Sequence, residues 1–139
     1  MKKQILFLCT HNSCRSQMAE ALANHFLGNR YQAFSAGTEA TRVNPLAIRV
    51  LSELDIDTTS LRSKTMDEFD GHNFDYVVTL CGDANEKCPL FFGGVQRFHR
   101  GFDDPSRLPG SEESVLPEFR RVRDEIKSWI IDYFGGAHS

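Results

Sequence analysis

Residues 6–22 read LFLCTHNSCRSQMAEAL, an apolar run that passes through a short polar loop into a helical pattern. Cys9 closes the apolar run, and Arg15 and Ser16 follow after five intervening residues. An apolar run of this length, bounded by polar residues, predicts a strand that is buried on both faces. The stretch therefore predicts a strand, a loop and a helix in direct succession.

The remainder of the chain repeats this alternation of strands and helices. Strand–helix alternation is typical of an α/β fold in which helices cover both faces of a parallel sheet. Ligands bind such sheets at the carboxyl ends of the strands, where Cys9 and Cys81 each close a predicted strand. The predicted strands are 4–9, 31–37, 74–81 and, more weakly, 94–100; the predicted helices are 15–28, 44–57 and about 116–134, with a loop at 104–114.

Length and composition limit the class of protein. A chain of 139 residues predicts a single domain, 1–139, and a net charge of -3 favours no nucleic-acid or membrane-surface partner. The apolar run near the N-terminus is too short for a signal peptide, and no stretch approaches the roughly 18 apolar residues of a membrane span. We therefore expect a cytoplasmic monomer, in which cysteines are more often catalytic or metal-binding than disulfide-bonded.

The loop after Cys9 has the properties of an anion-binding site. Backbone N–H groups in such a turn, together with a helix N-terminus, stabilise an anion and also a cysteine thiolate at its base. Arg15 offers a planar pair of donors to a tetrahedral oxyanion, and Ser16 can donate a hydrogen bond to the thiolate. The alternative is an inert buried cysteine beside a surface arginine. The predicted substrate-binding residues are Thr10, His11, Asn12, Ser13, Cys14 and Arg15, with Cys14 contributing backbone only.

Several segments resemble the thioredoxin-coupled arsenate reductases, which share the fold of the low-molecular-weight protein tyrosine phosphatases. That resemblance covers nearly the whole chain and implies a three-layer sandwich, with a four-stranded parallel sheet flanked by helices. The similar segments are CTHNSCRSQMAEA (9–21), SAG (35–37), NP (44–45), VVTLCGDANEKCP (77–89), GFDDP (101–105) and FRRVRDEI (119–126).

The resemblance also implies a reaction sequence. Cys9 would attack arsenate in the loop while Asp104 protonates the departing oxygen. Cys81 would then attack the Cys9 sulfur, which releases arsenite and forms a Cys9–Cys81 disulfide. Cys88 would next attack Cys81, which moves the disulfide to Cys81–Cys88. Reduced thioredoxin would supply the electrons, with no bound cofactor and with phosphate or sulfate as analogues of arsenate in the loop.

Two alternatives remain open at this stage. Because phosphate and arsenate are near-isosteres, the loop alone is equally suited to a phosphatase that uses Cys9, Arg15 and Asp104. Cys81 and Cys88 could also be half of a zinc site, although their spacing differs from the usual C-x2-4-C pattern, and we expect no metal. If the segment between Cys81 and Cys88 is helical, the two cysteines lie about 10.5 Å apart, which is too far for a disulfide. Formation of their disulfide therefore requires the segment 82–92 to rearrange.

Three positions depart from the pattern of the relatives. His11 replaces a glycine of the anion loop and is expected to point to solvent, and Arg100 replaces a frequent tryptophan. Some relatives bind potassium near the loop through residues that match Asn12, Glu20 and Ser35 and an aspartate. Lys64 matches the aspartate, and its ammonium group predicts activity that does not depend on potassium.

Overall fold

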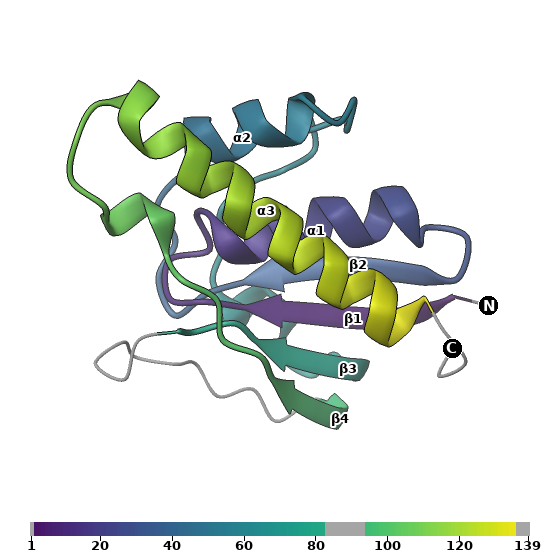
Figure 1. Cartoon of the computed structure of the whole chain (residues 1–139). Helices are drawn as coiled ribbons and strands as arrows, with labels where there is room; N and C mark the ends of the chain where they lie inside the picture. Colours follow the sequence, from purple (N-terminus) through teal and green to yellow (C-terminus); the bar gives the residue numbers. More distant parts are fainter. Residues whose placement is uncertain (1, 83–93, 136–139) are drawn as a thin grey trace.

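The computed structural model describes residues 2–82 and 94–135 (Figure 1). Strands and helices alternate along the chain, as the sequence predicts. The strands are β1 (Lys3–Leu8), β2 (Tyr31–Ala36), β3 (Phe74–Thr79) and β4 (Gly94–His99); the α-helices are α1 (Arg15–Phe26), α2 (Pro45–Ser52) and α3 (Glu112–Phe134); two 3-10 helices are η1 (Met66–Phe69) and η2 (Pro105–Arg107).

The described strands form one parallel sheet in the order β2-β1-β3-β4. Leu8 pairs with Ala36 on one side and with Thr79 on the other, so the central strands β1 and β3 end at the same edge. Cys9 follows β1 directly, and Cys81 lies two residues beyond the end of β3. The predicted parallel sheet is confirmed, and its carboxyl edge brings the two cysteine-bearing segments together.

The central strand β1 is buried on both faces, which explains its unbroken apolar sequence. Ile5 and Phe7 belong to the core that the α-helices cover, and α3 lies in front of the strands in Figure 1. Leu6 and Leu8 face the other way, into a smaller cluster that packs against Met66 and Phe69 of η1. The predicted three-layer fold is confirmed, although in the described chain only a 3-10 helix, and not an α-helix, covers the second face.

Helix α3 begins at Glu112, four residues before its predicted start, so the predicted loop at 104–114 is shorter than expected. The Ser111 side chain caps the helix by accepting a hydrogen bond from the Ser114 backbone N–H at 3.2 Å. A serine cap followed by acidic residues stabilises a helix start without any apolar periodicity. The apolar pattern used for the prediction therefore missed the first turn.

Helix α2 is shorter than predicted and ends at Ser52. Asn44 caps its start, with the side chain accepting from the Leu46 backbone N–H at 2.8 Å, and Pro45 occupies the first turn as expected. Asp55 has a φ of 59°, a left-handed conformation that no α-helix continues through. The predicted end at residue 57 was wrong for this reason.

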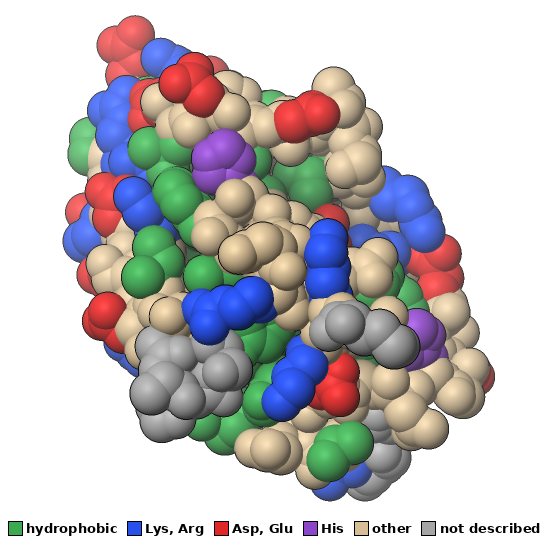
Figure 2. All heavy atoms as spheres, turned by 90° about the vertical axis from the view of Figure 1, so that its right-hand side faces the viewer, with side chains coloured by type: hydrophobic (Ala, Val, Ile, Leu, Met, Phe, Trp, Pro, Cys, Tyr) green, Lys and Arg blue, Asp and Glu red, His purple; other side chains and the backbone are tan. Residues whose placement is uncertain are grey.

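Acidic and basic side chains are interspersed on the side of the molecule at the amino ends of the strands (Figure 2). This mixture is typical of an ordinary solvated surface. Within residues 2–82 and 94–135, no helix is both long and apolar enough to cross a membrane.

Candidate active site

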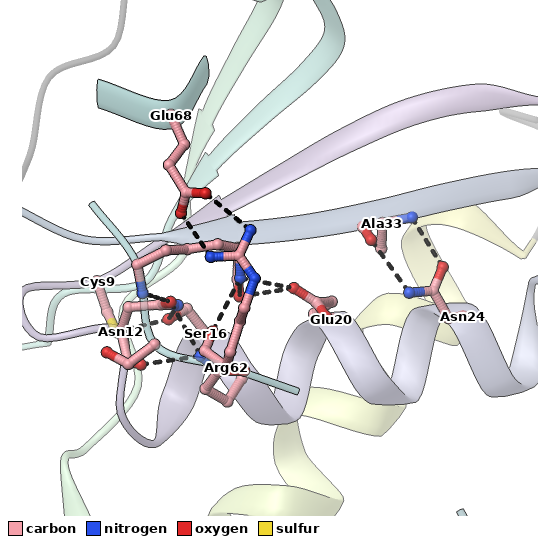
Figure 3. A network of polar contacts seen from close by, with 12 residues as sticks. Cys9, Asn12, Ser16, Glu20, Asn24, Ala33, Arg62 and Glu68 are labelled. Carbon is pink, nitrogen blue, oxygen red and sulfur yellow. Dashed lines mark hydrogen bonds and ion pairs between the residues drawn. The ribbon is translucent and has the colours of Figure 1, made fainter. Parts of the chain in front are cut away.

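The loop between β1 and α1 orients the Cys9 side chain toward the start of the helix. Cys9 is buried, and its Sγ lies 2.8 Å from the Ser16 Oγ. The Ser16 Oγ also accepts a hydrogen bond from the Asn12 Nδ2 at 2.8 Å, as Figure 3 shows. Either atom of the Cys9–Ser16 pair can be the donor, and when Cys9 is a thiolate the donor is the Ser16 hydroxyl. This is the geometry required to stabilise a thiolate.

Asn12 braces the loop from inside. Its φ of 49° lies in the left-handed region, which asparagine tolerates better than most residues. The fully buried Asn12 Oδ1 accepts from the Lys64 backbone N–H and from the Gln17 Nε2, each at 2.9 Å. Gln17 also donates to the carbonyl of Arg62 at 2.8 Å. The loop is therefore connected to the segment before η1 at several points.

Arg15 lies at the base of the loop, 3% exposed. Its Nη1 donates to the carbonyl oxygens of Leu80 and Phe102, each at 3.3 Å, and its Nη2 lies 3.4 Å from the Asp104 Oδ2. These partners come from the end of β3 and from the segment between β4 and η2. The planar guanidinium is thus oriented by two carbonyls and brought next to a carboxylate.

Asp104 is itself held in one orientation. Its Oδ1 accepts from the Ser106 backbone N–H at 3.0 Å and from the Ser106 Oγ at 2.6 Å, and this caps η2. The Oδ2 remains directed toward Arg15. Sequence reasoning did not identify Ser106, because an exposed serine in a loop carries no distinguishing pattern.

A cavity of about 10 Å³ lies at the centre of these groups. Its volume corresponds to roughly one water-sized group. Among the residues that the structure describes, seven line it. Six were predicted as site residues, namely Cys9, His11, Ser13, Cys14, Arg15 and Asp104, and the seventh is Ser106.

Cys14 differs from Cys9 in its electrostatic surroundings. Burial raises the pKa of the Cys14 thiol well above its ordinary value, and the negative charges of Asp104 and Cys9 add to this effect while Arg15 opposes it. A thiol with a raised pKa is a poor nucleophile at neutral pH. Cys14 therefore remains protonated, in agreement with its predicted role as a backbone position.

Cys81 is buried at the carboxyl edge of the sheet. It directly follows Leu80, whose carbonyl accepts from Arg15. A Cβ at Gly101 would lie 2.8 Å from the Cys81 carbonyl oxygen, and one at Gly82 would lie 2.2 Å from that of Phe102. Only glycines permit so close an approach. The backbone on both sides of Cys81 is thus packed tightly against the segment that leads to the cavity.

Cys88 and nearly all of the segment 82–92 lie outside the described residues. The predicted rearrangement of this segment therefore stays a prediction.

The Lys64 ammonium group lies among the side chains that the resemblance links to potassium. Its Nζ is 3.5 Å from the Glu20 Oε1, 3.5 Å from the Ser35 Oγ and 3.0 Å from the Arg62 carbonyl. Burial lowers the pKa of Lys64, while the neighbouring Glu20 opposes this shift. A second cation here would be repelled by the ammonium group, so these residues do not fit a potassium ion. In the parts of the chain that the structure describes, no cluster of three or more His, Cys, Asp or Glu is arranged to hold a metal.

His11 extends from the cavity to the surface. Its side chain is 52% exposed, and its Nε2 lies 3.2 Å from the Glu39 Oε2. This exposure agrees with the expectation that the imidazole points to solvent, and the residue also belongs to the lining of the cavity. Glu39 was not anticipated from the sequence.

The parallel sheet and the thiol-bearing loop are those of a known group of proteins: residues 4–136 match the model for low molecular weight phosphotyrosine protein phosphatase, and the chain belongs to this family. Its relatives include an enzyme named arsenate reductase from Bacillus subtilis, 51% identical over 131 residues and covering 94% of each chain.

Two solved structures extend this comparison. One, described as an arsenate reductase in the phosphate binding state, has a TM-score of 0.77 and 29% identity and covers 96% of this chain and 97% of its own. The other, a thioredoxin-dependent arsenate reductase of Corynebacterium glutamicum, has a TM-score of 0.61 and 29% identity and covers 94% of this chain and 63% of its own.

Proposed function

We propose that the protein reduces arsenate to arsenite with electrons from thioredoxin, and that Cys9 is the residue that attacks arsenic. The observation that carries this proposal is the Cys9 thiol 2.8 Å from the Ser16 hydroxyl, at a small cavity that is lined also by Arg15 and Asp104. The relatives named arsenate reductase support the choice of substrate, and one bound phosphate state supports an oxyanion in the loop.

The first step uses the residues around the cavity. The Cys9 thiolate attacks the arsenic atom, an As–S bond forms, and an arsenate oxygen departs as water after protonation by Asp104. Arg15, fixed by the Leu80 and Phe102 carbonyls, neutralises the oxyanion. The hydrogen bond from Ser16 stabilises the sulfur before attack and again when it later departs.

The second step transfers two electrons to arsenic. The Cys81 thiolate attacks the Cys9 sulfur, the As–S electron pair moves to arsenic, and arsenite leaves as a Cys9–Cys81 disulfide forms. Cys88 then attacks the Cys81 sulfur, which regenerates the Cys9 thiolate and leaves a Cys81–Cys88 disulfide. Thioredoxin reduces this last disulfide, so the reaction requires no bound cofactor. The close approach of Gly82 and Gly101 fixes the backbone of Cys81 against that of Phe102.

A cytoplasmic monomer suits this chemistry. Reducing thiol pools in that compartment keep all the participating cysteines in the thiol form between turnovers.

The second candidate is hydrolysis of phosphomonoesters by Cys9, Arg15 and Asp104. The family match and the shared loop favour it. A phosphocysteine needs only water for its second step, so this reaction leaves Cys81 and Cys88 without a catalytic role.

Arsenate turnover in the presence of thioredoxin, thioredoxin reductase and NADPH tests the proposal. The wild type should consume NADPH continuously, and Cys9→Ser should consume none. Cys88→Ser should release no more than one arsenite per protein molecule, because Cys9 and Cys81 still react once. A wild type that hydrolyses an aryl phosphate efficiently, but consumes no NADPH with arsenate, would establish the second candidate instead.

A further inference from the structure

We propose that His11, held by Glu39, makes the cavity selective for a free inorganic oxyanion and excludes phosphomonoesters. This inference rests on the proposed function and deepens it, because it names a residue that restricts the class of substrate in this chain. His11 is then a specificity-determining residue of the reductase.

The cavity has a buried floor and a polar, exposed rim. Cys9, Cys14 and Arg15 on the floor are each 3% exposed, whereas the His11 side chain is 52% exposed. Asp104 is 15% exposed and belongs, with Ser106, to the remaining outer lining. Any substituent on a bound oxyanion has to leave the cavity across this rim.

The His11 imidazole lies next to the carboxylate of Glu39 at the rim. Its Nε2 lies 3.2 Å from the Glu39 Oε2, and the carbonyl of His11 accepts a hydrogen bond from the Ser63 Oγ at 3.0 Å. Glu39 is restrained in turn, because its backbone N–H donates to the Thr10 carbonyl at 3.1 Å. The imidazole moves aside only with loss of its contact with the Glu39 carboxylate.

The segment that carries Glu39 also lies directly against the loop. A Cβ at Gly37 would meet the Thr10 carbonyl oxygen at 2.6 Å and that of Cys9 at 2.8 Å. The backbone that carries Glu39 is therefore held close to the loop.

The polarity of the rim favours a free oxyanion. A free oxyanion presents only oxygen atoms at the rim, and these suit the polar imidazole. An aryl ester presents an apolar ring there, which has to displace His11 and leave the Glu39 carboxylate without its imidazole partner. Polar sites discriminate strongly against ligands that leave their groups unpaired.

The test measures two activities on the same variants. We expect His11→Gly to raise the ratio of kcat/KM for para-nitrophenyl phosphate to kcat/KM for arsenate about tenfold or more, by analogy with other pocket-size changes. His11→Ala should act in the same direction. Glu39→Ala, which frees the imidazole but retains it, should give a smaller rise. His25→Ala is the matched control, because His25 is an exposed histidine on α1 remote from the cavity lining, and it should leave the ratio of the two activities unchanged.

Thermal unfolding identifies which of the two His11 variants is folded, and the ratio is compared only for folded protein. If a folded His11→Gly or His11→Ala variant has the wild-type ratio of aryl phosphate to arsenate activity, the inference is overturned. That result leaves the proposed function intact, since the latter fails only when the wild type itself does not reduce arsenate.

Discussion

Replacement of Lys64 by methionine removes one ammonium group and retains most of the apolar stem. The ammonium lies 3.5 Å from the Glu20 Oε1, and the side chains are 8% and 13% exposed. Two unit charges at this distance attract by about 5 kcal/mol at an effective dielectric constant of 20, before the loss of hydration is subtracted. Exposed pairs contribute about 0–1 kcal/mol, and disruption of a fully buried pair costs about 3–5 kcal/mol.

We therefore expect Lys64→Met to lower the free energy of unfolding by about 2 kcal/mol, between these two limits. For a chain of this length the corresponding fall in Tm is about 6 °C. The measurement is thermal and urea unfolding of the wild type and the variant. Lys2→Met is the matched control, because Lys2 is exposed, and its Tm should equal that of the wild type. The double variant with Glu20→Gln should recover part of the loss, since no unpaired carboxylate remains.

Potassium provides a second readout of the same ammonium group. At equal ionic strength, kcat/KM of the wild type for arsenate should be the same in NaCl and KCl. Lys64→Asp exchanges the ammonium for a carboxylate and should make both Tm and activity higher in KCl. A clear rise in wild-type kcat/KM with potassium, or a Lys64→Met variant that melts at the wild-type temperature, would refute this reasoning.

Three further predictions concern other parts of the chain. Because the pKa of the Cys14 thiol is raised in the folded state, its protonated form stabilises the fold at neutral pH; the free energy of unfolding should fall as the pH rises above about 9, and Cys14→Ala should remove this slope in pH-dependent urea titrations. Ser106→Ala removes the 2.6 Å hydrogen bond to Asp104 and should lower kcat for arsenate about tenfold with little change in KM, whereas Ser106→Thr should restore it; equal loss in both variants contradicts this role. Ser111→Ala removes the cap of α3 and should cost about 1 kcal/mol in urea unfolding, while an unchanged midpoint would show that the cap contributes nothing.

The loop could be predicted from the sequence because its chemistry is local. Cys9, Arg15 and Ser16 lie within eight consecutive residues, and the preceding apolar run fixes the loop at the end of a strand. Asp104 is separated from Arg15 by 89 positions, and only the resemblance pointed to it. Its position beside Arg15 results from the sheet order, which no local pattern contains.

Glu39 and Ser106 could not be predicted at all. Each is an exposed polar residue in a loop, and such residues follow no periodicity that a sequence pattern could reveal. The predicted end of α2 and the predicted start of α3 were wrong for a related reason. The end of α2 depends on one left-handed residue, Asp55, and the start of α3 on one serine cap, Ser111. In each case a single residue outweighed the apolar spacing of its neighbours.

The bracing of Asn12 has a consequence for the thermodynamics of ligand capture. Its buried amide and backbone carbonyl are tied to Gln17, Ser16 and the Lys64 N–H by contacts between protein groups alone. The loop is therefore preorganised, and an oxyanion that enters it causes little loss of backbone entropy. Calorimetric titration with phosphate should accordingly show a small heat-capacity change, and the amide exchange of the loop should already be slow in the free protein.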